Sequence, residues 1–325
     1  MKALVLIGGL GTRLRPVTYA VPKQLVPLAG KPMLFHVLDL LPADVEEVVL
    51  ATGYKASLID AAVRGRAWPW SIRTVAEATP LGTGGGMRHA GAAMSDPFFL
   101  LNSDVIAAAD LAAMAAGHRR SPRCGTMALA EVDDTRPYGV AALAADDRIT
   151  EFVEKPEPER APSHWINAGL AVWAREVLEE IPAGRPVSFE KEVVAGLLAR
   201  GLYGYRLGGF WDDAGTLVRL LRSQRFLFDA GRGAGTRLPR GSSGRGPVAA
   251  ADDADAAGAS FGGYVTLGAG VRVAAGAHVE DSVVMDGASV GEGATVVGAI
   301  VGPGGSVAAH RTVRGEVVGD GPAPG

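Results

Sequence analysis

The stretch that decides the fold opens the chain: residues 2–7 read KALVLI, residues 8–18 read GGLGTRLRPVT, and Pro22-Lys23 follows. A short apolar run that ends at glycines predicts a buried β-strand and then a tight loop. The loop exposes backbone N–H groups, and the next turn adds hydroxyl and guanidinium donors, so together they suit a polyphosphate. It is not a P-loop, because no Gly-Lys-Ser/Thr follows. It is not the dinucleotide fingerprint either, because Leu14 stands where the third glycine belongs.

Further along the chain, apolar runs alternate with helix-like stretches. The spacing predicts strands at residues 2–7, 45–51 and 97–101, with helices at 32–41 and 84–94 between them. Strands separated by helices favour a parallel α/β sheet. Later stretches predict added strands of a mixed sheet at 126–132, 149–154 and 166–173. One more helix is predicted at 188–200. We therefore expect a Rossmann-like domain with a mixed, mainly parallel sheet over residues 1–228.

Composition excludes several classes of protein. The chain has 325 residues, which suggests about two domains, and its formal net charge is −3, with 32 basic and 35 acidic residues. Because no basic excess is present, we expect neither a nucleic-acid nor a membrane partner. The single cysteine, Cys124, allows no intramolecular disulfide. No apolar stretch reaches the length of a membrane span and the N-terminus does not read as a signal peptide, so we expect a cytoplasmic protein.

Residues 229–262 differ in character from what precedes them. The stretch 230–235 reads AGRGAG, 241–244 reads GSSG, and 249–257 contains only Ala and Asp. Such sequences offer little apolar side-chain volume to bury. We therefore expect a flexible linker over 229–262.

The C-terminal part contains a repeat. Aliphatic residues recur with steps of six, six and five, so the cycle repeats every 17 residues: Leu267, Val273, Val279, Val284, Val290, Val296, Val301, Val307, Val313, Val318. A fixed period with one aliphatic position predicts stacked coils. Each strand and turn would form one side of a triangular coil and point one aliphatic side chain inward. The pattern resembles the left-handed β-helix of hexapeptide-repeat proteins, and we expect about three coils over residues 263–325.

Residues 30–216 contain further motifs in a fixed order. They are Gly30-Lys31-Pro32, Pro80-Leu81-Gly82-Thr83-Gly84, Leu101-Asn102-Ser103-Asp104, Tyr138-Gly139-Val140, Val153-Glu154-Lys155-Pro156, Asn167-Ala168-Gly169, Phe189-Glu190-Lys191-Glu192 and residues 210–216, FWDDAGT. Together with the glycine string, they resemble the sugar-1-phosphate nucleotidyltransferases over residues 2 to about 220. The resemblance is greatest to the mannose-1-phosphate guanylyltransferase branch, whose members also carry a C-terminal left-handed β-helix.

The resemblance implies a reaction in which a sugar 1-phosphate attacks the α-phosphorus of an NTP and pyrophosphate leaves. Such chemistry needs positioned cations rather than a nucleophilic side chain. Arg13 and Lys23 would bind the phosphates near the reacting centre, beside Asp104. Backbone and hydroxyl groups of the loop would complete the nucleotide cradle: Gly8, Gly9, Gly11, Thr12.

The resemblance also implies a Mg²⁺ site and two substrate subsites. Asp104 follows an apolar strand, at the end of a parallel sheet where ligands usually bind. Asp213 matches the second metal ligand by register, although Asp212 stands beside it. Gly82 and Thr83 match the loop that reads the base. Positions that contact the sugar or its phosphate in relatives match the following residues: Gly139, Glu154, Lys155, Asn167.

Alternative functions remain open at this point. Our first expectation is that the substrates are GTP and mannose 1-phosphate. Glucose-1-phosphate thymidylyltransferase is the alternative enzyme, because its phosphate chemistry is the same. A catalytically silent regulatory subunit would keep the fold but could lose the charged residues, and this chain retains them. A β-helix acyltransferase fused to a nucleotidyltransferase is a weaker possibility. Because the ends of a short β-helix expose unpaired coil surface, we also expect a homo-oligomer.

Overall fold

The computed structural model describes residues 1–120 and 123–319. The chain forms two compact units, each built from two separate stretches of sequence. Unit 1 comprises Met1–Gly9 and Val37–Trp211, whereas unit 2 comprises Leu10–His36 and the chain from Asp212 onward. The boundaries fall inside the glycine loop, inside helix α2 (Met33–Leu38) and inside strand β13 (Trp211–Asp213).

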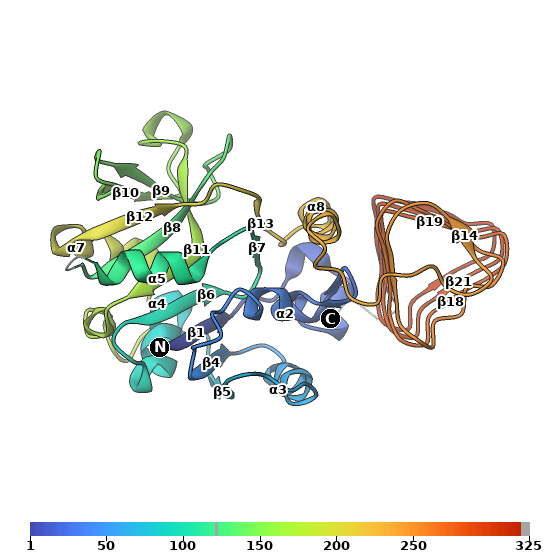
Figure 1. The fold of residues 1–325 in the computed structure, drawn as a ribbon, viewed down its shortest axis with the longest axis horizontal. Helices are drawn as coiled ribbons and strands as arrows, with labels where there is room; N and C mark the ends of the chain where they lie inside the picture. The colour runs from blue at the N-terminus through green and yellow to red at the C-terminus, as the bar shows by residue number, and fades with distance from the viewer. Residues whose placement is uncertain (121–122, 320–325) are drawn as a thin grey trace. The chain divides into compact units, whose positions relative to one another are not determined.

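The parallel core of unit 1 surrounds strand β1 (Lys2–Ile7), which has the bounds that the sequence predicts. Strands β4 (Glu47–Thr52) and β6 (Phe98–Asn102) flank β1, and both run parallel to it. Strand β5 (Ser71–Ala76) continues the sheet beyond β4 (Figure 1). Apolar side chains on both faces of β1, β4 and β6 are buried, as expected for central strands of a parallel sheet.

The other half of this sheet is mixed. Strand β11 (Trp165–Trp173) runs antiparallel to β6 and joins the parallel core to the later strands. These are β8 (Gly125–Glu131), β9 (Gly139–Leu143), β10 (Ile149–Glu154) and β12 (Leu202–Arg206). The strand order is β10-β9-β11-β6-β1-β4-β5, with β8 between β11 and β12. The expectation of a mixed sheet in an α/β domain is confirmed.

Short helices pack on this sheet. Helix α3 contacts β5, α4 contacts β1 and β4, and α5 contacts β8 and β11. The helix expected over 188–200 is broken at Val193 into separate turns, because both Val193 and Val194 enter the core. The remaining elements of unit 1 are α3 (Ala56–Arg64), α4 (Gly82–Ala90), α5 (Leu111–Arg119), α6 (Phe189–Glu192), α7 (Val194–Leu197) and β7 (Val105–Ala107).

The N-terminal stretch of unit 2 is made of single turns and one hairpin. A 3-10 turn, η1 (Thr12–Leu14), is followed by α1 (Val17–Ala20) and η2 (Lys23–Leu25). Strands β2 (Pro27–Leu28) and β3 (Lys31–Pro32) then form an antiparallel pair. The longest helix of the described residues, α8 (Leu217–Asp229), belongs to the same unit, and the Thr216 hydroxyl caps it by accepting the Arg219 N–H.

The C-terminal part of unit 2 is a left-handed β-helix with a triangular cross-section (Figure 1). Parallel strands form its three sides. The first side is β14 (Ser243–Gly244), β16 (Ser260–Gly262), β19 (His278–Glu280), β22 (Thr295–Val297) and β25 (Thr312–Arg314). The second side is β15 (Val248–Ala250), β17 (Val265–Leu267), β20 (Val283–Val284), β23 (Ile300–Val301) and β26 (Val317–Val318). The third side is β18 (Arg272–Val273), β21 (Ser289–Val290) and β24 (Ser306–Val307).

The 17-residue period appears directly in the strand register. His278 pairs with Thr295, and Thr295 pairs with Thr312. The repeating aliphatic residues form the buried core of the coils, as the sequence predicts. Residues 320–325 of the expected β-helix domain lie outside the described residues.

The expected flexible linker is wrong over residues 243–262. These residues form β14, β15 and β16, which pair with later strands of the β-helix. Ala250, Ala256 and Phe261 occupy the inward positions and are buried. Alanine gives no aliphatic signal at these positions, so the stack begins about one coil earlier than the valine pattern indicates.

Neighbouring alanines provide a test of this first coil. Ala256 is 1% exposed, whereas Ala257 is exposed. Ala256→Asp buries a carboxylate without a partner and should cost about 3 kcal/mol or more, because buried charges are strongly disfavoured. We expect a fall in Tm of several degrees for Ala256→Asp and almost none for Ala257→Asp, measured by differential scanning calorimetry. Equal, small shifts in both variants would contradict the buried coil.

Candidate functional site

The glycine loop connects unit 1 to unit 2. Gly9 and Gly11 have φ values of 85° and 63°, a region that residues with a Cβ rarely adopt. A Cβ on Gly11 would also lie 2.7 Å from Thr18 Cγ2. The Thr18 hydroxyl donates a 2.8 Å hydrogen bond to the Gly11 carbonyl and fixes the turn. Gly8, Gly9, Thr12 and Arg13 remain exposed, as a phosphate cradle requires.

Unit 2 brings the two predicted cations close to the loop. Lys23 lies beside Gly11, because a Cβ on that glycine would be 3.3 Å from Lys23 Cβ. Arg13 lies against Gly215, where a Cβ would be 2.5 Å from Arg13 Nη2. A side chain at position 215 would therefore require the Arg13 guanidinium to move.

The two adjacent aspartates of β13 have different environments. The Asp212 side chain is 1% exposed, and its Oδ2 accepts a 2.6 Å hydrogen bond from Arg222 Nε. Burial raises the pKa of Asp212, and the hydrogen bond from Arg222 opposes this shift. Asp213 is 20% exposed and forms an ion pair with Arg219. The geometry therefore makes Asp212 a structural residue and leaves Asp213 as the carboxylate that a ligand can approach.

Asp104 lies in the turn between β6 and β7 in unit 1. The turn is attached to the central strand, because the Ser103 N–H donates to the Leu6 carbonyl at 3.2 Å. Asp104 is partly exposed. It does not cap the next helix, since Asp110 caps α5 by accepting the Ala113 N–H at 2.8 Å.

Strands β9, β10 and β11 bring the predicted sugar-phosphate residues together. Gly139 pairs with Glu154, and the pairing of Ile166 with Val140 places Asn167 next to Gly139 in the sheet. A Cβ on Gly139 would lie 2.8 Å from Glu154 Oε2, so only glycine leaves this carboxylate in place.

Lys155 follows Glu154 in a left-handed conformation with φ of 50°. Its N–H donates to the Tyr138 carbonyl at 2.9 Å, and its Nζ lies 3.6 Å from Glu154 Oε1. The side chain is 57% exposed. The ammonium group is therefore accessible to an anion from solvent.

The predicted base-reading residues are held by the segment around Val187. Gly82 has φ of 72°, and a Cβ there would lie 2.5 Å from the Val187 carbonyl oxygen. The Val187 N–H donates to the Leu81 carbonyl at 2.8 Å. Glu77 Oε2 accepts the Leu81 N–H at 3.1 Å, which fixes the loop from its other side.

Glu190 is a candidate residue to which the sequence assigns no role. The Thr83 hydroxyl donates to Glu190 Oε2 at 2.6 Å and accepts the Phe189 N–H at 2.9 Å. Burial raises the pKa of Glu154, and the charge of Glu190 raises it further, whereas Lys155 lowers it. Glu190 therefore interacts with Thr83 through a hydrogen bond and with Glu154 through its charge. Its only sequence signal is the quoted motif at 189–192.

The predicted residues thus fall into two groups. Unit 2 contains Gly11, Thr12, Arg13, Lys23 and Asp213. Unit 1 contains the remaining candidates, namely Gly8, Gly9, Gly82, Thr83, Asp104, Gly139, Glu154, Lys155 and Asn167.

Comparisons with known proteins identify the family of the chain. The model of the nucleotidyl transferase family matches residues 2–229, and the model of the GlmU-like C-terminal hexapeptide matches residues 258–320. The chain belongs to the nucleotidyl transferase family. These matches confirm the resemblance that the motifs indicate, namely a nucleotidyltransferase domain followed by a left-handed β-helix.

Individual relatives are similar over much of the chain. A mannose-1-phosphate guanylyltransferase of Mycobacterium tuberculosis is 38% identical over 295 residues, covering 88% of this chain and 80% of that protein. A mannose-1-phosphate guanylyltransferase catalytic subunit beta of Danio rerio is 40% identical over 66% of this chain, and the match spans 61% of that protein. The crystal structure of HddC from Yersinia pseudotuberculosis complexed with GMP-PN has a TM-score of 0.59 and 25% identity, covering 70% of this chain and 99% of HddC.

Two further findings concern the described residues only. None of their helices has the length and apolar character needed to cross a membrane. Among the same residues, no group of three or more His, Cys, Asp or Glu side chains is arranged to hold a metal ion.

The environments of the two aspartates give a stability prediction. Asp212→Asn removes the buried partner of Arg222 and should cost about 2 kcal/mol, because hydrogen bonds to charged groups contribute about that much. Asp213→Asn removes a more exposed ion pair and should cost less than about 1 kcal/mol. Urea unfolding followed by circular dichroism measures both. A larger loss for Asp213→Asn than for Asp212→Asn would contradict the assignment.

Proposed function

We propose that this protein transfers a nucleotidyl group from an NTP to a sugar 1-phosphate and releases pyrophosphate, with GTP and mannose 1-phosphate as the preferred pair. The observation that carries the proposal is the loop at residues 8–13, in which Gly11 permits a tight turn and Arg13 follows against Gly215. The names of the most similar relatives support the choice of substrates. The guanine nucleotide analogue in the HddC structure supports the choice of base.

The reaction joins two anions, so the protein must supply positive charge and fixed geometry. A phosphate oxygen of the sugar 1-phosphate attacks the α-phosphorus, and the bond from that phosphorus to the bridging oxygen of the β-phosphate breaks. Arg13 and Lys23 neutralise the triphosphate and stabilise the leaving pyrophosphate. The backbone N–H groups of the loop, together with Thr12, hold the phosphates in line for the attack.

Lys155 binds the phosphate of the sugar 1-phosphate, and its exposed ammonium group suits this role. Glu154 precedes Lys155 in the chain, and Asn167 lies beside Gly139 in the sheet. Glu154 accepts hydrogen bonds from the sugar hydroxyl groups, and the Asn167 amide group donates to them. Gly82 and Thr83 bind the base, and Glu190 keeps Thr83 in place through the 2.6 Å hydrogen bond.

The carboxylates present fit Mg²⁺. This ion is usually held by one or two carboxylates together with phosphate oxygens and water, so a dedicated cluster of protein ligands is not needed. Asp104 and Asp213 are partly exposed, and Asp213 forms an ion pair with Arg219, whereas Asp212 is buried. We assign Asp104 and Asp213 as the ligands. When bound, the ion neutralises phosphate charge and helps orient the triphosphate.

Two other functions are less favoured. Glucose-1-phosphate thymidylyltransferase activity would use the same charged residues with a different base and sugar. A silent subunit is disfavoured, because the chain keeps Arg13, Lys23, Asp104, Lys155 and Asp213. We further propose a homo-oligomer, because the terminal coils of a short β-helix present unpaired strand edges. We also propose a cytoplasmic location, where NTP is available.

Loss of the charged groups tests the reaction. We expect Arg13→Ala and Asp104→Ala to fold normally and to lower kcat/KM by at least about 100-fold, since each removes a group that acts on transition-state charge. Pyrophosphate release from GTP and mannose 1-phosphate is the measurement. Arg64→Ala is the control, because Arg64 is an exposed residue of α3 that pairs with Asp60 on the same helix. Near-wild-type rates in either site variant would overturn the assignment.

The raised pKa of Glu154 gives a pH prediction. Its carboxylate is lost at a higher pH than that of an ordinary glutamate, which titrates near about 4.3. Acidification should therefore raise the KM for the sugar 1-phosphate in the wild type. Glu154→Gln should show a higher KM at neutral pH and lack this acid limb. The substrate's own phosphate titrates equally in both proteins, so identical pH profiles of KM would contradict the role of Glu154.

A further inference from the structure

One side of the β-helix differs from the other two. On the second side, the outward residues of the first four strands are buried, namely Ala249, Thr266, Val283 and Ile300, and only Val317 of the last strand is partly exposed. The corresponding residues on the first and third sides are polar and partly or fully exposed: Ser260, His278, Thr295, Thr312, Arg272, Ser289, Ser306. The second side, hereafter the covered side, therefore packs against other parts of unit 2.

Helix α8 is tied to the covered side by Gln224, which is fully buried. Its Nε2 donates to the Tyr264 carbonyl at 2.9 Å, and its Oε1 accepts the Thr266 hydroxyl at 2.7 Å. The same Oε1 accepts the Ala29 N–H of the β2–β3 hairpin at 3.3 Å. One carboxamide thus joins the helix, the hairpin and the coils.

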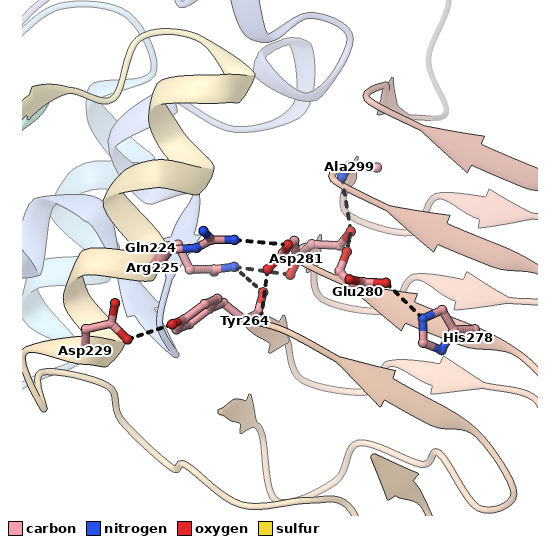
Figure 2. A network of polar contacts seen from close by, with 9 residues as sticks. Gln224, Arg225, Asp229, Tyr264, His278, Glu280, Asp281 and Ala299 are labelled. Atoms are coloured by element: carbon pink, nitrogen blue, oxygen red, sulfur yellow. Dashed lines mark hydrogen bonds and ion pairs between the residues drawn. The ribbon is translucent and has the colours of Figure 1, made fainter. Parts of the chain in front are cut away.

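Ion pairs and hydrogen bonds surround this carboxamide (Figure 2). Arg225 Nη2 lies 3.2 Å from Asp281 Oδ2, and the Tyr264 hydroxyl donates to Asp229 Oδ1 at 2.8 Å. The N-terminal turns of the same helix carry Arg219 and Arg222, which hold the two aspartates of β13. The helix therefore links the β-helix to Asp213.

A second contact reaches the segment that carries the predicted cations. A Cβ on Gly302, next to β23, would lie 2.9 Å from Val17 Cγ2 and 3.2 Å from the Val318 carbonyl oxygen of the next coil. A Cβ on Gly319 would lie 3.1 Å from Pro16 Cγ. Val17 is 1% exposed. Arg13 lies four residues before Val17, and Thr18, the next residue, makes the hydrogen bond that fixes Gly11.

We propose that the β-helix positions the phosphate-binding segment, and that Gly302 is a positioning residue for the reaction. The covered side fixes Val17, and through it the turn at Gly11 and the cations on either side, Arg13 and Lys23. The absence of a side chain at Gly302 lets Val17 seat against the coil. This inference rests on the proposed function. It gives a role in the reaction to the β-helix, a part of the chain to which we assign no substrate contact.

Gly302→Ala and Gly262→Ala form a matched pair. Each glycine follows an inward residue of the β-helix, but the Cβ at 262 would meet only flexible or exposed side chains, with Glu280 Cγ nearest at 3.3 Å. We expect Gly302→Ala to lower kcat about tenfold and to leave the KM for the sugar 1-phosphate within about twofold, because Glu154 and Lys155 belong to unit 1. Gly262→Ala should stay within about twofold of wild type in both.

The double variant Val17→Ala/Gly302→Ala separates positioning from a general loss of folding. Shortening Val17 removes the methyl group with which the side chain introduced by Gly302→Ala would collide. If the contact between residues 17 and 302 causes the fall in kcat, the double variant should have a higher kcat than Gly302→Ala. The effects of the two substitutions on kcat would then be non-additive, as expected for residues in contact. If Gly302→Ala acts only by destabilising the coil, adding Val17→Ala lowers stability and activity further.

Hydrogen exchange of amides in residues 11–24 provides a readout without substrate. Gly302→Ala should speed this exchange relative to Gly262→Ala, and the double variant should slow it again. Unchanged exchange together with unchanged kcat would overturn the positioning role. If the wild type releases no pyrophosphate with any substrate pair, the proposed function fails, and the exchange measurement alone still supports or overturns the fixing of the segment by Gly302.

Discussion

The close approach of backbone to side chains at the glycine loop is the constraint on which the remaining arrangement depends. The chain leaves the central strand at Ile7 and must turn at once, and Gly11 is packed so tightly against Thr18 that no side chain fits there. This turn places Arg13 against Gly215 on one side and Lys23 beside the loop on the other. At Gly8 and Gly9, by contrast, a Cβ would meet nothing within 4 Å. The proposed polyphosphate cradle therefore depends on the exposed backbone of Gly8 and Gly9 as well as on the tight turn at Gly11.

The two units divide the charged groups according to the substrate that each is proposed to hold. The triphosphate end depends on unit 2, where turns and single residues rather than long strands carry the cations. The sugar end depends on strand pairing in unit 1, where Gly139 and Glu154 face each other across β9 and β10. Thr83 and Glu190 connect the base-reading loop to Glu154, so one carboxylate affects the pKa of another across two subsites.

Patterns of apolar residues predict much of this structure. The bounds of β1 and β10 and the 17-residue period of the β-helix are correct. β1 and the period depend on buried aliphatic side chains, whereas β10 buries only Ile149 and Phe152. The first coil is missed because alanine replaces valine at its inward positions. The covered side could be read from the sequence in hindsight, since outward residues are mainly apolar on only one of the three sides. The role of Glu190 depends on contacts between distant segments, which no local pattern encodes.

The central claim is the reaction itself, and one assay tests it most directly. Pyrophosphate release is measured with Mg²⁺ for GTP, dTTP, ATP, UTP and CTP, each combined with the 1-phosphates of mannose, glucose and heptose. The account predicts turnover with GTP and mannose 1-phosphate well above every other pair. Turnover with dTTP and glucose 1-phosphate instead would contradict the substrate assignment, and no release in any combination from folded protein would contradict the reaction.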